Sequence, residues 1–265
     1  RFQIVDTVAA MTPLTKMTRQ IASPAMIPTM IREAFRVAQA ERPGPVHLEL
    51  PEDIAAAPVE EIRLIPPHHT EQPVGCPAAI AAAAEVVRGA ERPLIMLGAD
   101  AARPRCCHAL SGFVARMQIP YVTTQMGKGT VSGATDLYLG TAALTEDDYV
   151  HDAIEQADVI VTIGHDTSEK PPFAMSDPSK TVIHIGFRPA VVEQVYFPQL
   201  EVVGDIEPTL QALGDLLDGT VPHAQALLPL REGILAKIAE RATEDRFTPQ
   251  RIVHEVRRIM PQDGI

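Results

Sequence analysis

Several apolar runs in this chain each end on a glycine or a small polar residue. The runs lack polar alternation, which is typical of strands covered on both faces in a parallel sheet. In such a sheet the carboxyl ends of the strands meet at one edge, where glycine lets backbone N–H groups approach a phosphate. The residues that follow the runs are Gly98, Thr124, Gln125, Met126, Gly164, Gly204 and Asp205. They predict a nucleotide-sized crevice, although tight strand-to-helix turns need glycine with or without a ligand.

Histidines and cysteines do not supply a second reactive centre. His151, His165 and His184 have no spacing typical of metal ligands, and a hydrogen-bonded histidine at a strand end is the ordinary interpretation. The adjacent Cys106 and Cys107 are interpreted as partly buried, unreactive thiols. We therefore predict no metal site, and no set of residues in this sequence is expected to carry out a reaction alone.

Alternating strands and helices position the residues of the predicted crevice. The predicted strands span residues 93–97, 120–124, 158–163, 181–185 and 201–203. The predicted helices span residues 78–89, 103–117, 147–156 and 207–217. This alternation predicts an α/β fold with a doubly wound, mostly parallel, Rossmann-like sheet over residues 78–220.

The sequence before this unit has a different pattern. Residues 1–20 show no clear period and are predicted to be irregular. Ser23 is predicted to cap a helix that continues to about residue 40, and a strand is predicted over residues 46–50. The proline-rich residues 63–77 are predicted to be an exposed linker.

Helical extensions are predicted after the sheet. A second linker is expected from residue 221, followed by helices over residues 229–243 and 249–260. Thr248-Pro249 is predicted to begin the second of these helices, because proline is favoured at the first helical position.

Composition excludes several classes of protein. The chain has 265 residues, 46% of them hydrophobic, which is enough for a sizeable core. Its net charge of −11 argues against a nucleic-acid partner, because phosphate neutralisation needs clustered Lys and Arg. No apolar stretch has the length of a membrane span, and no signal-peptide pattern is present, so a cytoplasmic location is predicted. Both ends are expected to be cut from a longer protein.

A set of short motifs, read in order, spans nearly the whole chain. The motifs are Phe2-Gln3, Asp6-Thr7-Val8, Thr15-Lys16, Ile27-Pro28, Arg32-Glu33-Ala34-Phe35, Arg42-Pro43-Gly44-Pro45-Val46, Leu50-Pro51-Glu52-Asp53, Thr124-Gln125-Met126-Gly127-Lys128-Gly129, Leu139-Gly140, Ala157-Asp158-Val159-Ile160, Ile183-His184-Ile185 and Val203-Gly204-Asp205-Ile206. In this order and spacing they resemble the acetolactate synthase large subunits and related thiamine diphosphate enzymes.

The resemblance implies a place for each part of the chain in a longer enzyme. Residues 1–62 resemble the end of the pyrimidine-binding domain, residues 78–220 the central domain, and residues 221–265 the linker and start of the diphosphate-binding domain. The family's catalytic glutamate and its metal–diphosphate motif are expected outside this chain. Residues 1–265 alone are therefore expected to be inactive.

The resemblance also implies an activity for the intact enzyme. It would be a transferase that uses thiamine diphosphate and Mg²⁺ to decarboxylate pyruvate and join the product to a second 2-keto acid, as in branched-chain amino acid biosynthesis. The intact protein is expected to be a homo-oligomer, a dimer or tetramer. The alternatives are another 2-keto acid decarboxylase or carboligase such as a glyoxylate carboligase, a stand-alone nucleotide-binding module, and a purely structural domain.

Individual site residues follow from the same resemblance. Gln3 matches a residue that lines the substrate end of the active site, and Lys16 matches a lysine near the cofactor channel; an ordinary surface role is the alternative for each. Gly140 belongs to the same set as the crevice residues named above. By the resemblance, this set matches the residues that hold FAD in biosynthetic relatives. The chain has Gly186 where flavin-binding relatives have an acid, and it has no arginine between Gly164 and Lys170. It therefore resembles the flavin-free, catabolic type, and no FAD is expected.

Overall fold

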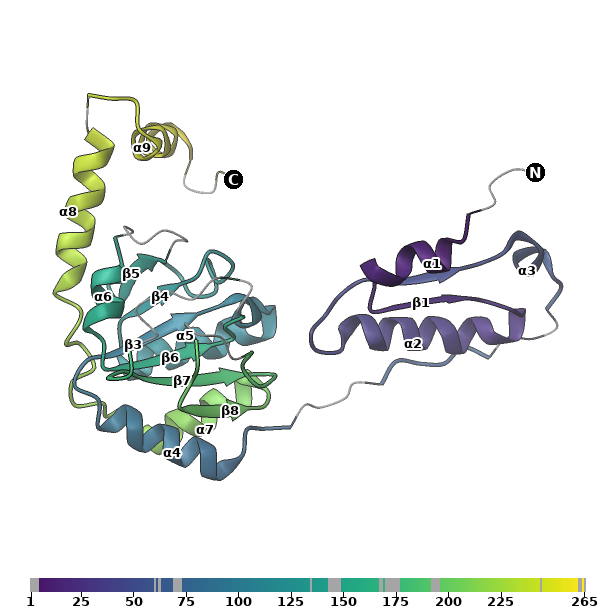
Figure 1. The fold of residues 1–265 in the computed structure, drawn as a ribbon, viewed down its shortest axis with the longest axis horizontal. Coiled ribbons are helices and arrows are strands. Elements are labelled where there is room, and N and C mark those ends of the chain that lie inside the picture. The colour runs from purple at the N-terminus through teal and green to yellow at the C-terminus, as the bar shows by residue number, and fades with distance from the viewer. Residues whose placement is uncertain are drawn as a thin grey trace. The chain divides into compact units, whose positions relative to one another are not determined.

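Six parallel strands form the main sheet of the computed structural model (Figure 1), in the order β5-β4-β3-β6-β7-β8. The strands are β3 Pro93–Leu97, β4 Tyr121–Thr123, β5 Tyr138–Thr141, β6 Val159–Ile163, β7 Thr181–Gly186 and β8 Leu200–Val203. In the register of the three central strands, Leu97 lies beside Ile163 and Ile163 beside Ile185. The predicted doubly wound parallel sheet is confirmed, because the strands read as near-continuous apolar runs and helices cover both faces.

The chain divides into two compact units, residues 1–71 and 72–265, and the sheet belongs to the second. The boundary lies within the stretch predicted as a linker; the assignment of the flanking segments to neighbouring domains stays a prediction. The structure describes residues 5–59, 61, 63–68, 73–133, 135–142, 149–166, 169, 177–191, 196–243, 245–261 and 264.

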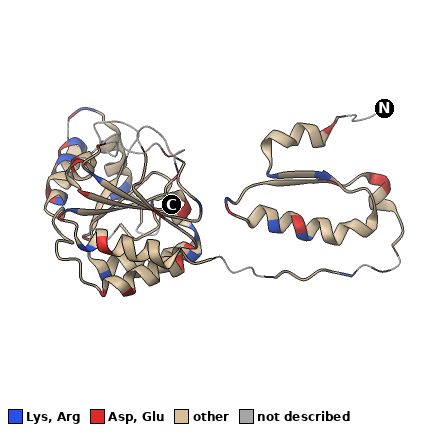
Figure 2. Cartoon of the chain, turned by 60° about the horizontal axis from the view of Figure 1, so that its bottom comes forward, with Lys and Arg blue, Asp and Glu red and all other residues tan. Residues whose placement is uncertain are grey.

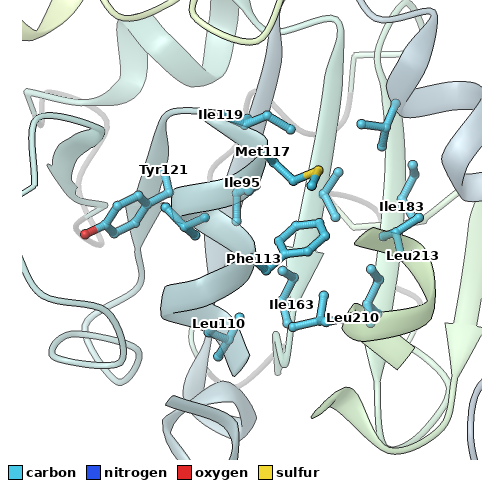
Figure 3. Packing of buried hydrophobic residues seen from close by; sticks show 14 of the residues in the cluster. Ile95, Leu110, Phe113, Met117, Ile119, Tyr121, Ile163, Ile183, Leu210 and Leu213 are labelled. Atoms are coloured by element: carbon cyan, nitrogen blue, oxygen red, sulfur yellow. The ribbon is translucent and has the colours of Figure 1, made fainter. Parts of the chain in front are cut away.

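Three long helices cover one face of the sheet. They are α4 Pro77–Arg88, α5 Pro104–Met117 and α7 Ile206–Leu217. Figure 3 shows the resulting core, in which Phe113 of α5 and Leu213 of α7 lie among Ile95, Ile163 and Ile183 of the strands. Successive strand residues point to opposite faces, so every second side chain of these strands enters this core.

The remaining side chains of the strands pack on the second face. Leu94, Met96 and Ile160 contact the short helix α6 His151–Gln156 and the start of helix α8 Leu230–Thr243. The turns before α8 belong to the same core, because Leu227 is buried there although a linker was predicted. The last helix, α9 Pro249–Ile259, begins where predicted, and the Thr248 hydroxyl accepts the backbone N–H of Arg251 at 3.1 Å.

The sequence prediction missed strand β5. It is a four-residue edge strand that pairs only with β4 in the described sheet, and it contains Gly140 at φ +143°. Glycine within a strand and a length of four residues weaken the local strand signal. Helix α6 begins at His151, four residues later than predicted, and the predicted residues 147–148 lie outside the described part of the chain.

The first unit contains a second parallel pairing. Strands β1 Met17–Gln20 and β2 Val46–Glu49 lie side by side, with Met17 opposite Val46. Its helices are α1 Thr7–Met11, α2 Ile27–Gln39 and α3 Glu52–Ala56, with short 3-10 turns at Thr12–Leu14 and Pro24–Met26. Residues 1–20 were predicted to be irregular, and this prediction is wrong from Thr7 onward. Ser23 precedes a 3-10 turn and makes no side-chain cap, so the predicted N-cap is also wrong.

Charges on the second unit are mixed. In the view of Figure 2, Lys and Arg lie interspersed with Asp and Glu along the helices that cover its sheet. None of the helices in the described part of the chain combines the length and apolar character needed to cross a bilayer.

Candidate functional site

The loops after β3 and β6 touch each other through their backbones at the carboxyl edge of the sheet. Gly98 N–H donates to Ile163 O at 2.9 Å, and Asp100 N–H donates to Gly164 O at 2.9 Å. A Cβ atom on Gly98 would lie 2.6 Å from Gly164 O, and one on Gly164 would lie 2.2 Å from Ala101 N. Gly164 also has φ +65°, a conformation that favours glycine. Close backbone approach explains both glycines.

Backbone N–H groups at this edge are already used within the protein. Thr124 N–H donates to Leu97 O at 2.9 Å, and Gly164 N–H donates to Ile185 O at 2.8 Å. Gly204 N–H donates to Gly186 O at 2.9 Å. Each backbone donor makes one strong bond, so these groups are not available to a phosphate in this structure. Their geometry does not fit the phosphate cradle that the sequence predicts.

A buried carboxylate, Glu169, lies between the same loops. Its side chain is 3% exposed and accepts a hydrogen bond from the Thr124 hydroxyl at 2.8 Å. It also accepts from the backbone N–H of Asp166 at 3.4 Å and from the backbone of Ala99. Burial raises the pKa of Glu169, and these three bonds oppose that rise. A Cβ atom added to Gly98 would lie 2.8 Å from the Glu169 Oε2 atom, so a larger residue at position 98 would collide with this carboxylate.

Arginine bridges connect the strand-end loops. Arg188 Nη2 lies 3.4 Å from Asp166 Oδ2 and 3.7 Å from Asp100 Oδ2, so it joins the loops after β3, β6 and β7. Arg105 of α5 pairs with Asp205 and stacks over the Phe187 ring at 4.7 Å. Opposite charges held this close reinforce the contacts between loops.

One cavity among the described residues lies at this edge, and it is small. Asp100, His165, Asp166, His184 and Arg188 line a cavity of about 20 Å³. A water molecule needs ~10–15 Å³ of such volume, whereas cofactor pockets are typically ~300–1,000 Å³. This cavity is therefore too small for an adenine dinucleotide.

A chain of hydrogen bonds runs through the second face of the sheet. Thr162 Oγ1 lies 2.7 Å from Tyr196 OH, which lies 2.9 Å from His184 Nδ1. His184 Nε2 lies 3.0 Å from Arg188 O. Because a carbonyl oxygen only accepts, His184 carries its proton on Nε2, and Tyr196 donates to Nδ1. The ordinary interpretation of a strand-end histidine therefore holds for His184.

His165 differs from His184. Its side chain is fully buried against the Tyr196 ring, with centroids 4.6 Å apart. Among the described residues neither ring nitrogen has a hydrogen-bond partner. Burial, assisted by the neighbouring His184, lowers the pKa of His165 to about 4, although Asp166 opposes the shift. A neutral imidazole with both nitrogens unpaired is costly unless another group satisfies it.

The crevice residues named from the sequence separate into two groups. Gly98 and Thr124 lie beside Glu169, and Gly164 lies against Gly98. The others lie elsewhere: Gln125 and Met126 are exposed, Gly140 packs against Val150 within β5, Gly204 packs against Val74 and Gly75, and Asp205 caps α7 through the Glu207 N–H. Predicting a shared crevice from strand ends alone could not distinguish these two groups.

Gly186 has a local explanation. A Cβ atom there would lie 2.8 Å from His184 Nε2 and 3.4 Å from Arg188 O. An acid at this position would therefore displace the hydrogen bond between His184 and Arg188. Glycine at this position therefore leaves room for the His184–Arg188 hydrogen bond.

Lys16 lies in the first unit and contacts a helix end. Its Nζ atom donates to Val37 O at 2.6 Å and to Ala40 O at 2.7 Å, at the C-terminus of α2. A cation is favoured there because the last carbonyls of a helix have no partners within the helix. The active-site roles of Lys16 and Gln3 stay predictions, and Gln3 lies outside the described residues.

We expect Lys16→Met to loosen the end of α2. Loss of two charged hydrogen bonds at an exposed site should lower the local free energy of opening by about 1 kcal/mol. Hydrogen exchange of the backbone N–H groups near Ala40 measures this change. Arg19→Met removes one positive charge from the same unit and is the control, so equal loss of protection in both variants would contradict the capping role.

Sequence reasoning missed three polar groups of the site. Glu169, Arg188 and Tyr196 were not proposed, although Glu169 lies within the strand-end stretch that was compared for its arginine content. An acid four residues after a strand-end histidine was the available signal.

The described residues contain no cluster of side chains typical of a metal site. They contain no group of three or more His, Cys, Asp or Glu side chains that could hold a metal ion. The resemblance places the Mg²⁺ and diphosphate sites of the intact enzyme outside this chain, and that assignment stays a prediction.

Comparison with known proteins gives one family. The family described as thiamine pyrophosphate enzyme, central domain, matches residues 80–213, which include strands β3 to β8. The catabolic acetolactate synthase of Raoultella terrigena is 28% identical over 98% of this chain and 48% of its own length. A probable acetolactate synthase large subunit of Methanocaldococcus jannaschii is 31% identical over 80% of this chain and 37% of its own length.

A differently named relative is about equally similar. The glyoxylate carboligase of Escherichia coli O157:H7 is 27% identical over 99% of this chain and 46% of its own length. The chain spans less than half the length of each of these curated relatives.

Proposed function

We propose, because this chain belongs to the thiamine pyrophosphate enzyme family through its central domain, that the intact protein is a carboligase of the acetolactate synthase type. The single observation that carries the proposal is the similarity to the catabolic acetolactate synthase, which covers 98% of this chain. Thiamine diphosphate, when bound, supplies the decarboxylation of a 2-keto acid and the transfer of its two-carbon product.

The contribution of this chain is structural in that proposal. The central domain lies between the two domains that hold the cofactor in the family, and its strand-end crevice is filled by its own side chains. We propose that the intact enzyme needs Mg²⁺, works without FAD as a cytoplasmic homo-oligomer, and takes pyruvate as its first substrate. The small cavity and the Glu169 carboxylate support the proposal of a flavin-free enzyme.

A second candidate is a glyoxylate carboligase. The similarity to the Escherichia coli enzyme covers 99% of this chain at nearly the same identity, so the comparisons favour neither substrate strongly. The two reactions share the cofactor chemistry and differ in the 2-keto acid that enters.

The test is to express the full reading frame that contains this chain and to supply thiamine diphosphate and Mg²⁺. We expect acetolactate from pyruvate, measured as acetoin after acid treatment, and no requirement for FAD. Residues 1–265 alone are the control and should form no product. Product from glyoxylate only would favour the second candidate, and no turnover of either keto acid would contradict both.

A further inference from the structure

Three donors surround the carboxylate of Glu169. They are the Thr124 hydroxyl, the Asp166 N–H group and the backbone N–H group of Ala99, and we call them the anion cradle. The donors come from the ends of three different strands, so the fold converges on one point. Charge-assisted hydrogen bonds to a carboxylate are roughly twice as strong as neutral ones.

His165 is an independent sign that this place is built for a ligand. Its side chain is fully buried, its Nδ1 atom lies 3.6 Å from Glu169 Oε2, and neither nitrogen has a hydrogen-bond partner among the described residues. Buried polar side chains in native proteins are nearly always satisfied. An unpaired imidazole beside a carboxylate is expected where a small polar group can enter.

Position in the fold distinguishes Glu169 from an ordinary loop carboxylate. Asp158, at the opposite edge of the sheet, also accepts two backbone N–H groups, from Glu91 at 2.8 Å and Arg92 at 2.7 Å, but these bonds lie at the exposed surface. Glu169 lies between the loops of β3, β4 and β6, where parallel sheets usually bind ligands. The same type of contact is therefore buried at Glu169 and exposed at Asp158.

We infer that the crevice is a carboxylate-binding site that the chain fills with its own Glu169. The internal carboxylate takes the donors that an external ligand would need and holds the three loops together. The native protein is thereby closed at this edge to ligands that carry a carboxylate. This inference does not depend on the substrate of the intact enzyme.

Chemical rescue tests the inference on the chain of residues 1–265. Glu169→Ala removes the carboxylate and leaves the cradle and a space for formate. We expect a lowered Tm for this variant and a saturable rise on addition of sodium formate, about 3 °C at ten times the dissociation constant. The wild-type chain, with its cradle filled, should respond to formate no more than to sodium chloride at equal ionic strength.

Two further variants make the result specific. Thr124→Val in the Glu169→Ala background removes one donor and should weaken formate binding about tenfold, the value of a hydrogen bond to a charged group. Asp158→Ala is the matched control; it loses a carboxylate with two backbone donors but should show no saturable rescue. If Glu169→Ala does not fold without formate, its refolded yield is compared in sodium formate and in sodium chloride. A higher yield in formate then supports the inference.

Other outcomes would overturn the inference. A formate response of Glu169→Ala no larger than that of the wild-type chain would mean that the donors do not form a site. An equal response after Thr124→Val would place formate elsewhere. A response to inorganic phosphate but not to formate would show a different ligand chemistry.

Discussion

Replacing Gly164 with alanine is expected to lower the free energy of unfolding by about 3–5 kcal/mol. Two costs add at this position, because φ is +65° and the new Cβ would lie 2.2 Å from Ala101 N. The contacted atom belongs to the backbone, so the clash cannot be relieved by a side-chain rotation. A loss of this size is a large fraction of the stability of a typical domain.

Urea unfolding followed by circular dichroism measures the effect, since the chain has no tryptophan for fluorescence. Gly112→Ala is the matched control. Gly112 lies in helix α5 with nothing within 4 Å of its Cβ position, so alanine there should stabilise the protein by about 0.5–1 kcal/mol. Similar stability of the Gly164→Ala and wild-type chains would contradict the close backbone approach of the β3 and β6 loops.

Acidification is expected to destabilise the sheet-containing unit through His165. Its pKa is lowered from 6.5 to about 4, so between these values the unfolded chain binds the proton more readily than the folded chain. The stability that neutral His165 contributes to the folded chain is fully present above pH 6.5 and is lost as pH falls towards 4. A shift of this size corresponds to about 3 kcal/mol for a fully buried side chain.

Two neighbours also change the pH dependence. Burial lowers the pKa of His184, which acts in the same direction, whereas burial raises the pKa of Glu169, which acts in the opposite direction. The informative quantity is therefore the difference between the wild-type chain and His165→Phe at each pH. That difference should change by about 3 kcal/mol between pH 6.5 and 4.

Urea titrations at a series of pH values give this difference. His108→Gln is the control, because His108 is exposed on α5, away from the histidine network. A His165→Phe variant that loses stability on acidification in parallel with the wild-type chain would show that His165 does not remain neutral in the folded state.

Local sequence signals determined the sheet and its glycines. The apolar runs at Leu94–Leu97 and Val159–Ile163 were long enough to predict β3 and β6, and covering helices followed from the spacing between runs. The need for glycine at positions 98 and 164 also followed, because a tight turn at a strand end favours glycine. These features depend on residues close together in the chain.

The contents of the crevice were decided by the tertiary structure. The Thr124 hydroxyl and Glu169 are 45 residues apart, and no local pattern shows that they meet. Likewise, β1 is a short polar segment that becomes a strand only through its pairing with β2. Lys16 also contacts the end of α2 through a long-range hydrogen bond, because its partner Ala40 lies 24 residues later in the chain. The sequence by itself determined where the strands end and where glycine is required. Long-range packing decided which hydrogen-bond donors at the strand ends are occupied, because a partner such as Glu169 comes from a distant segment.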